Sequence, residues 1–374
     1  MNQKAEITEK TARLVKMLAE ENLGGVLINS QPNFAWITGG ANNGIDGSRE
    51  NGAATLLIRQ DGKRFVLASR IEMPRILTEE ISAEDFEPVE FGWEDEKASP
   101  DFLAELGASL LNDKERLGAD LPVGGQAQTI ESKIAVCRYQ LTGFEIERYR
   151  LLGRDAGKAI GELMKTLSPG ESEKEVARMA RFELAKHDIN AVVTLVAADE
   201  RLKKYRHPVP TEKKWEKTLM LVVCARRAGL IASLSRIICA GAIPQELEHR
   251  TQAAARVNAK ILAATKPAAT GAQIYETAAR AYADEGFKGE QNLHHQGGAT
   301  GYRTRDWVAH PASGEKVRMN QAFAWNPSIT GTKVEETCIV SEDKIEIITA
   351  SPDWAQIPVL LDGREYSFPG VLSI

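Results

Sequence analysis

Apolar residues recur along the first part of the chain at spacings that alternate between helix and strand. Leu14, Met17 and Leu18 fall at helical spacing among charged residues, which predicts an amphipathic helix. Asp61–Gly62 between two apolar runs is typical of a hairpin turn. The predicted helices are 5–22, 70–80 and 100–111, and the predicted strands are 26–28, 54–58, 64–68, 86–91 and 116–120. This order indicates an α/β unit.

The second part begins where the composition shifts to Gly, Gln and Ser, and we place the boundary at about 142, giving domains 1–142 and 143–374. Ser172 with Glu175 forms a capping-box pattern between two long helical segments. The predicted helices are 145–167, 172–186, 243–265 and 270–286, and the predicted strands are 191–197, 219–224, 230–234, 322–327, 333–340 and 344–348. Helices, a strand pair, more helices and then strands indicate an α+β fold.

Composition and charge narrow the functional classes. A chain of 374 residues exceeds what one hydrophobic core usually supports, which agrees with two domains. The net charge of −5, without a Lys/Arg block, argues against a nucleic-acid partner, and no long apolar run predicts a membrane span. The four cysteines form no CxxC pair, and the polar N-terminus leads directly into a helical pattern. We therefore expect a cytoplasmic protein.

The stretch 293–305 holds the densest candidate chemistry. Two adjacent imidazoles precede a glycine-rich segment, and two arginines follow it. Imidazole can act as base, acid or ligand, glycine allows close backbone approach, and arginine matches a carboxylate. The alternative is a glycine-rich hairpin whose histidines pack and whose arginines form surface ion pairs. The candidate residues are His294, His295, Gly297, Gly298, Arg303 and Arg305.

Short sequence motifs along nearly the whole chain resemble those of the creatinase/prolidase/aminopeptidase P superfamily, the clan with the pita-bread fold. They are Glu145–Arg148, Ser168–Glu173, His207–Pro208, Ser233–Arg236 in place of D-x-T-R, Gly297–Gly301 in place of G-H-G-x-G, Asn326–Pro327 in place of E-P-G, and Val334–Thr337 in place of R-x-E-D-T. The resemblance implies a pita-bread domain at 143–374 preceded by a smaller creatinase/prolidase N-terminal-like domain. It also implies a homodimer in which the smaller domain reaches the partner's site.

The departures from these motifs bear directly on chemistry. Peptidases of the clan bind two divalent metals with two Asp, one His and two Glu. The corresponding positions here fall on the segment 222–224, on Ser233, on Gly298 and on Asn326, and only Glu335 keeps a carboxylate. Such residues cannot replace anionic or imidazole donors to a hard divalent cation. We therefore expect no metal cofactor of the usual two-ion kind.

The resemblance to creatinase suggests chemistry without metal, because creatinase hydrolyses a C–N bond with an imidazole base and holds the substrate carboxylate with arginine. The hypothesis is a metal-independent C–N hydrolase of a small carboxylate-bearing amide or amidine. His207, His294 and Glu335 would be catalytic, Glu335 by orienting or balancing an imidazole. The substrate-binding residues would be His295, Arg303, Arg305, Asn326 and the backbone amides of Gly297 and Gly298.

Three alternatives stay open. The chain could be an Xaa-Pro dipeptidase or aminopeptidase that requires a divalent metal such as manganese. A single ion could instead be held by a rebuilt set of His207, His294, His295 and Glu335. Finally, the chain could be a peptidase-like binding protein that recognises a peptide or small molecule without turnover.

Overall fold

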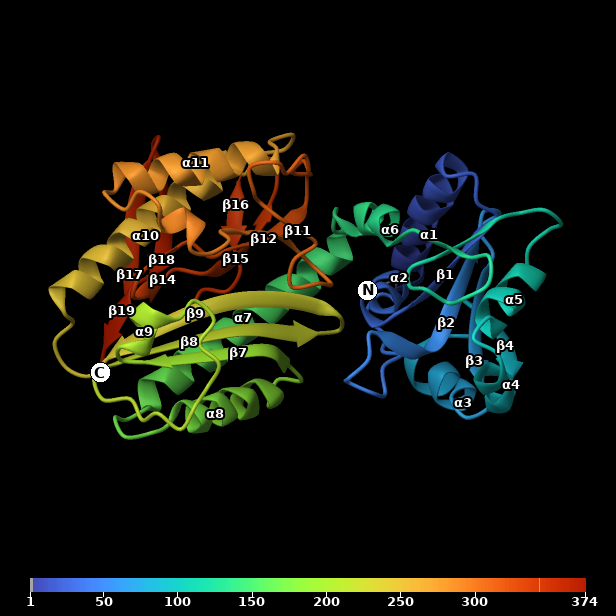
Figure 1. Cartoon of the computed structure of the whole chain (residues 1–374), viewed down its shortest axis with the longest axis horizontal. Helices are drawn as coiled ribbons and strands as arrows, with labels where there is room; N and C mark the ends of the chain where they lie inside the picture. The colour runs from blue at the N-terminus through green and yellow to red at the C-terminus, as the bar shows by residue number, and fades with distance from the viewer. Residues whose placement is uncertain (1–2, 343) are drawn as a thin grey trace. The chain divides into compact units, whose positions relative to one another are not determined.

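The chain forms two compact units, Met1–Tyr139 and Gln140–Ile374. The structure is a computed structural model that describes residues 3–342 and 344–374 (Figure 1). The division after Tyr139 compares with the boundary predicted at about 142. Each unit has its own sheets and its own apolar interior, so each is described separately.

The N-terminal unit is a six-stranded mixed sheet in the order β4-β3-β2-β1-β5-β6 with helices around it. Its strands are β1 (Gly25–Ser30), β2 (Asn51–Arg59), β3 (Arg64–Ser69), β4 (Glu87–Phe91), β5 (Leu117–Ala119) and β6 (Gln128–Thr129). Its helices are α1 (Gln3–Glu20), α2 (Gln31–Thr38), α3 (Met73–Arg75) continued by a π-helical turn (Ile76–Glu80), α4 (Trp93–Ala98), α5 (Phe102–Ser109) and α6 (Glu131–Arg138). This is the predicted α/β unit.

Two buried charged side chains of this unit have hydrogen-bond partners within it. Lys10 on α1 is fully buried, and its Nζ lies 2.6 Å from Glu6 Oε1 and 2.5 Å from the carbonyl oxygen of Trp36. Asp120, also buried, accepts hydrogen bonds from the backbone and side chain of Ser30 at the start of α2. These groups join α1, α2 and the sheet.

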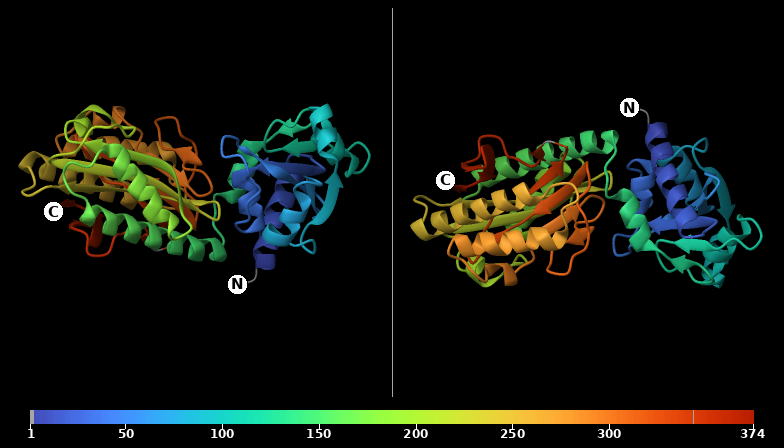
Figure 2. Two further views of the ribbon diagram at one scale, coloured as in Figure 1. Left: turned by 90° about the horizontal axis from the view of Figure 1, so that it is seen from below. Right: turned by 90° about the horizontal axis from the view of Figure 1, so that it is seen from above.

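The C-terminal unit contains a four-stranded sheet (β19-β9-β8-β7), a five-stranded sheet (β11-β10-β12-β15-β16) and two small hairpins. The strands are β7 (Asn190–Ala198), β8 (Thr218–Arg227), β9 (Leu230–Cys239), β10 (Gly297–Thr300), β11 (Trp307–Val308), β12 (Gln321–Trp325), β13 (Ser328–Ile329), β14 (Thr332–Lys333), β15 (Glu336–Val340), β16 (Ile345–Ile347), β17 (Gln356–Leu361), β18 (Arg364–Pro369) and β19 (Val371–Ser373). The helices are α7 (Gly143–Thr166), α8 (Glu173–Ala185), α9 (Arg201–Lys204), α10 (Gln245–Ala264), α11 (Gly271–Asp284) and a 3-10 turn (Glu290–Asn292). Figure 2 shows α10 and α11 side by side along this unit.

A stripe of glycines lets α7 approach the segment after β16 backbone to backbone. A Cβ added at Gly153 would lie 2.4 Å from the carbonyl oxygen of Ile348, and one at Gly157 would lie 2.5 Å from that of Thr349. A Cβ at Gly161 would lie 2.6 Å from the Cβ of Ser351. The four-residue spacing puts all three glycines on one helix face, so this close contact runs along the helix.

The predicted elements are present, with one informative difference. The strand predicted over 333–340 is interrupted, because Val334 and Glu335 lie between β14 and β15. Two hydrogen bonds stabilise the irregular backbone between β14 and β15. Asn258 Nδ2 donates to the carbonyl of Val334, and Glu335 N donates to Ser235 Oγ. Several short elements were not predicted by the sequence analysis, namely α4, α6, α9, β6, β10, β11, β13 and the strands after 355. None of the helices described by the structure is both long and apolar enough to cross a membrane.

Candidate functional site

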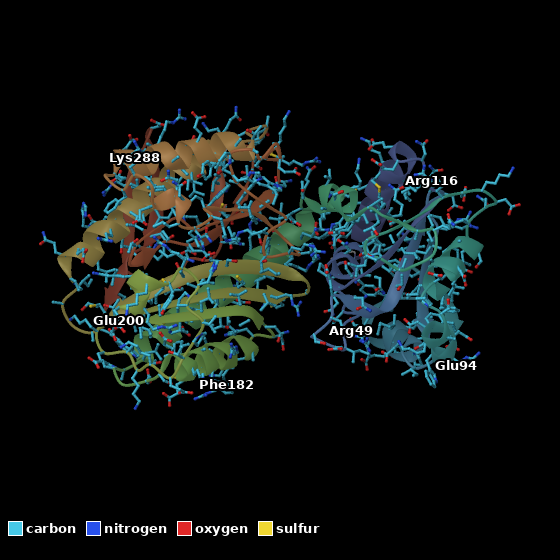
Figure 3. All side chains as sticks on the ribbon, viewed as in Figure 1. Arg49, Glu94, Arg116, Phe182, Glu200 and Lys288 are labelled. Carbon is cyan, nitrogen blue, oxygen red and sulfur yellow. The ribbon has the colours of Figure 1, made fainter. Side chains whose placement is uncertain are left out.

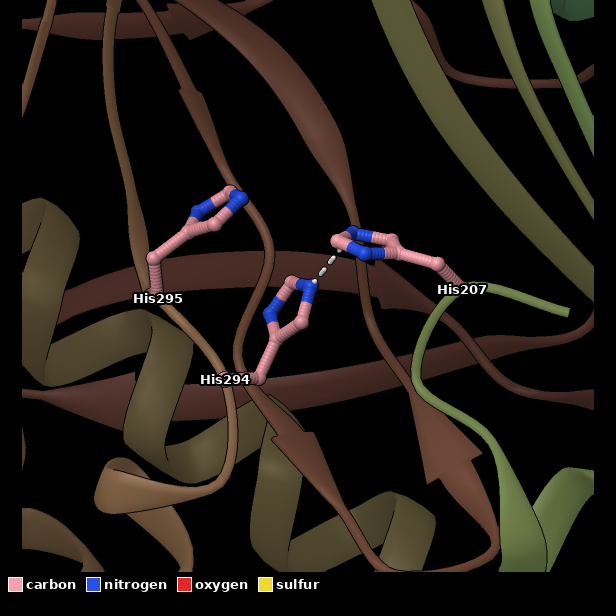
Figure 4. A group of neighbouring side chains, drawn as sticks. All are labelled: His207, His294 and His295. Carbon is pink, nitrogen blue, oxygen red and sulfur yellow. Dashed lines mark hydrogen bonds between the residues drawn. The ribbon is translucent and has the colours of Figure 1, made fainter.

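Three imidazoles meet inside the C-terminal unit (Figure 4). His207 precedes β8, whereas His294 and His295 precede β10. The Nε2 atoms of His207 and His294 are 3.0 Å apart, and the rings of His294 and His295 stack with centroids 4.3 Å apart. His207 is exposed and His294 is only 8% exposed, so solvent reaches this pair from the side of His207.

The residues next to each imidazole fix its position. Arg206 forms an ion pair with Glu290 at 2.5 Å, which ties the His207 segment to the 3-10 turn before His294. On the other side, the hydroxyl of Tyr282 donates to Gln296 Oε1, and Gln296 Nε2 donates to the carbonyl of His294. The two imidazole segments are therefore held from α11 and from the turn that follows it.

All three histidines are held in the neutral form at neutral pH. Burial lowers the pKa of His294 to about 2, with further lowering by the charge of Lys333. Burial, followed by Arg305 and Lys333, lowers the pKa of His295 to about 4. Burial and Lys333 also lower the pKa of His207, while Glu335 opposes that shift. Neutral imidazoles can accept a proton or a metal ion.

Glu335 lies at the break between β14 and β15 and is only 2% exposed. Its Oε1 lies 3.2 Å from Arg305 Nη2, whereas its Oε2 has no hydrogen-bond partner among the described residues. The direct partner of Glu335 is therefore arginine. Its effect on an imidazole is through charge, since it favours the protonated form of His207.

Lys333 is a buried cation that the sequence analysis did not single out. It is 5% exposed, and burial lowers the pKa of its ammonium, while the charge of Glu335 acts in the opposite direction. Its Nζ forms no hydrogen bond or ion pair with any described residue. A lysine two positions before Glu335, within a run of strand-forming residues, was the signal in the sequence.

The positions matched to the family's metal ligands come together in the fold. Cys224 and Ser233 pair across β8 and β9, with Sγ and Oγ 3.3 Å apart, and Ser235 N donates to the carbonyl of Glu335. The β10–β12 pairing brings Gly298 beside Ala324, close to the end of the strand that precedes Asn326.

These positions do not fit a pair of divalent ions. Glu335 is the single carboxylate among them, and Oε1 of that carboxylate is engaged by Arg305. The ammonium of Lys333 adds positive charge where the family binds cations. The separate cluster of His207, His294 and His295 has ligand atoms within 4.8 Å of one another, a set that could hold one ion. The charge of Lys333, which lowers the pKa of all three imidazoles, also opposes a dication there.

The other predicted binding residues have distinct surroundings. Gly297 and Gly298 belong to β10, and Gly298 pairs on both sides, so the backbone amides of this strand point toward neighbouring strands. The oxyanion role assigned to them is not retained for this reason. Arg303 and Arg305 lie in the irregular segment between β10 and β11. Asn326 is 3% exposed and its Oδ1 has no partner among the described residues.

Cys224 does not have the surroundings of a nucleophile. It is buried, and burial raises the pKa of its thiol, with the charge of Glu335 acting in the same direction. A catalytic cysteine requires a lowered pKa and access to the substrate. We therefore interpret Cys224 as part of the wall beside Ser233.

Family models match both units of the chain. Residues 147–348 match the model "Metallopeptidase family M24", and residues 10–152 match "Creatinase/Prolidase N-terminal domain". These matches confirm the resemblance, the two-domain α+β fold and the prediction of a hydrolase related to Xaa-Pro peptidases. No curated protein matches the sequence.

Solved structures share the fold at low identity. The prolidase from Pyrococcus horikoshii OT3 has a TM-score of 0.75 and 18% identity over 92% of this chain and 98% of that chain. The X-Pro aminopeptidase from Thermotoga maritima MSB8 has a TM-score of 0.73 and 18% identity over 91% and 98%. The N-terminal domain of FACT complex subunit SPT16 from Cicer arietinum (chickpea) has a TM-score of 0.68 and 9% identity over 92% and 96%.

Proposed function

We propose that this chain, which belongs to metallopeptidase family M24, is a hydrolase that cleaves a C–N bond with imidazole rather than metal. The substrate of this proposal is a small amide or amidine that carries a carboxylate. The observation that supports it best is the 3.0 Å contact between the Nε2 atoms of His207 and His294, in a setting that keeps both rings neutral.

His207 is the general base of the proposed reaction. A hydrogen bond between two neutral imidazoles requires one nitrogen to donate and the other to accept. When His207 donates from Nε2 to His294, its Nδ1 is left to accept a proton from the attacking water. The water oxygen then bonds to the amide or amidine carbon, the C–N bond breaks, and His207 returns the proton to the leaving nitrogen. The nearby charge of Glu335 stabilises the protonated His207 during this step.

Hydrolysis by this route is tested with amidines, lactams and N-acyl amino acids, assayed with and without a chelator. We expect turnover that the chelator does not change. Replacing His207 by alanine should lower kcat/KM by about 10²- to 10⁴-fold, the usual contribution of general acid–base catalysis. His310→Ala is the matched control, because His310 is exposed and its Nδ1 accepts only from the nearby Ala312 backbone.

The metal-dependent alternative makes the opposite prediction. The family match and the cluster of three imidazoles favour a test of Xaa-Pro dipeptides with added manganese or cobalt. Stoichiometric metal in the purified protein, with Xaa-Pro cleavage lost in chelator, would overturn the imidazole proposal.

A binding protein without turnover is a second candidate. It is favoured by the absence of carboxylate and imidazole donors at four of the five ligand positions. This candidate predicts a ligand that binds the wild type and His207→Ala equally, with no product formed by either protein.

A further inference from the structure

The cluster of Lys333, Arg305 and Glu335 has one more positive charge than negative charge. Arg305 and Glu335 form an ion pair at 3.2 Å. The other arginine close enough to act on Lys333, Arg206, is paired with Glu290 at 2.5 Å. The three imidazoles next to this group are neutral, so they do not balance a charge. The ammonium of Lys333 is therefore left without a counter-ion.

A buried and uncompensated cation is costly for a folded protein, because the interior solvates a charge poorly. Lys333 is 5% exposed, and its ammonium donates to no acceptor among the described residues. Its backbone is fixed, since Lys333 pairs with Ser328 in the β13–β14 hairpin and its carbonyl accepts from Ser235 Oγ. The side chain therefore starts from a fixed backbone within electrostatic reach of Glu335, and the partner that its Nζ lacks among the described residues would be an anion.

The same charges reverse the electrostatics of the metallopeptidase site. There, carboxylates hold cations; here, uncharged Ser233, Gly298 and Asn326 stand in their place, and a lysine precedes the remaining carboxylate. Arg305 is engaged by Glu335 through Nη2, although its Nε has no partner among the described residues, whereas the ammonium of Lys333 has no such anionic contact. Asn326 offers an amide at a position where the family has a ligand, and its side chain is buried.

We propose that Lys333 binds the carboxylate of the ligand, occupying the place that the metal ions have in related peptidases. The inference rests on the proposed function in placing the substrate at the imidazole cluster. It concerns binding rather than turnover, and it assigns to Lys333 the role that sequence analysis gave to Arg303 and Arg305. Lys333 is a specificity-determining residue, because it selects for a negative group at one end of the substrate.

Acetate is the probe for this site, with acetamide as its neutral counterpart, measured on the full chain at constant ionic strength. Acetate binding is followed by the thermal midpoint and by the NMR signals of the histidine rings. We expect Lys333→Met to weaken acetate binding by about tenfold or more, the size expected of one hydrogen bond to a charged group. Acetamide should not bind measurably to any variant.

Three further variants make the result specific. Lys333→Arg keeps the charge and should retain acetate binding, whereas Lys333→Gln should lose it. Lys288→Met is the matched control, because Lys288 is exposed on the surface of the same unit (Figure 3). Acetate binding by wild type that is unchanged in Lys333→Met and Lys333→Gln, or no acetate binding by wild type, would overturn the inference. Unchanged acetate binding in these variants, with turnover by the wild type, would overturn the inference and leave the hydrolase proposal standing. Lost acetate binding in the variants, with no turnover by the wild type, would overturn the hydrolase proposal alone, so the two failures are distinguishable.

Discussion

Two buried lysines in this chain have opposite surroundings. Lys10 in the N-terminal unit is fully buried, and its ammonium contacts Glu6 Oε1 and the carbonyl of Trp36. Lys333 in the C-terminal unit is 5% exposed and has no such contact among the described residues. The first lysine stabilises a fold by satisfying its neighbours. The second lysine has no such partner, which is the arrangement expected of a residue held in place for a ligand.

Lys10→Met tests the structural side of this comparison and should have the largest effect. Removing the ammonium takes away the salt bridge that Lys10 forms with buried Glu6, which costs about 3–5 kcal/mol for a buried pair. Urea unfolding of the full chain, followed by fluorescence and circular dichroism, should show early unfolding of the N-terminal unit. A loss below about 1 kcal/mol would mean that Lys10 is as dispensable as a surface residue.

Lys333→Met should change stability in the opposite direction. The substitution keeps an unbranched side chain of similar length and removes an uncompensated buried charge, so the free energy of unfolding should rise by about 1–3 kcal/mol without ligand. The measurement is urea unfolding of the C-terminal unit, with Lys288→Met as the control near zero. A destabilised Lys333→Met protein would show that the ammonium has a structural partner.

The pH dependence of stability tests the influence of Lys333 on its neighbours. The folded pKa of His295 is about 4, below the usual value of 6.5. The unfolded chain therefore takes up the proton first, and the stability from the neutral imidazole is complete above pH 6.5 and lost as the pH falls toward 4. Allowing for solvent screening, the loss attributable to His295 at about pH 5 is about 1 kcal/mol.

Unfolding of wild type and His295→Gln between about pH 7.5 and 5 isolates this contribution, and the wild type should lose more stability. In Lys333→Met the His295 pKa should rise, because one of the charges that lowers it is gone. Identical slopes in wild type and His295→Gln would contradict the assigned shift.

The exposed ion pair of Arg150 with Glu346 should contribute least to the free energy of unfolding among the charged groups compared here. The two side chains meet at 2.7 Å but are 40% and 31% exposed. Glu346→Gln should therefore cost about 0.5–1 kcal/mol, and added salt should reduce that difference. Thermal unfolding at two salt concentrations checks this prediction, and a loss as large as that of Lys10→Met would remove the distinction between exposed and buried pairs.

The sequence predicted the fold well because periodicity and turn residues act locally. The capping box of Ser172 and Glu175 and the helices on either side of Lys266–Pro267 are present as expected. Motif order placed His207 and His294 in one predicted site, and in the fold their Nε2 atoms lie 3.0 Å apart across 87 residues of sequence. Burial was the missing information: Lys333 was assigned to a strand, and only packing shows that its ammonium is inside and unpaired. Pairing was missing too, since the partner of Glu335 is Arg305.

The glycine stripe on α7 has a genetic consequence. Gly157 abuts the backbone of Thr349, whose carbonyl accepts from Arg236 and whose hydroxyl accepts from the amide of Thr337. Thr337 in turn hydrogen-bonds both backbone groups of Ser233. A screen for loss of function should therefore recover alleles on a helix that carries no residue of the candidate site. Such alleles would be conditional on temperature, and second-site suppressors would map to the segment 348–351.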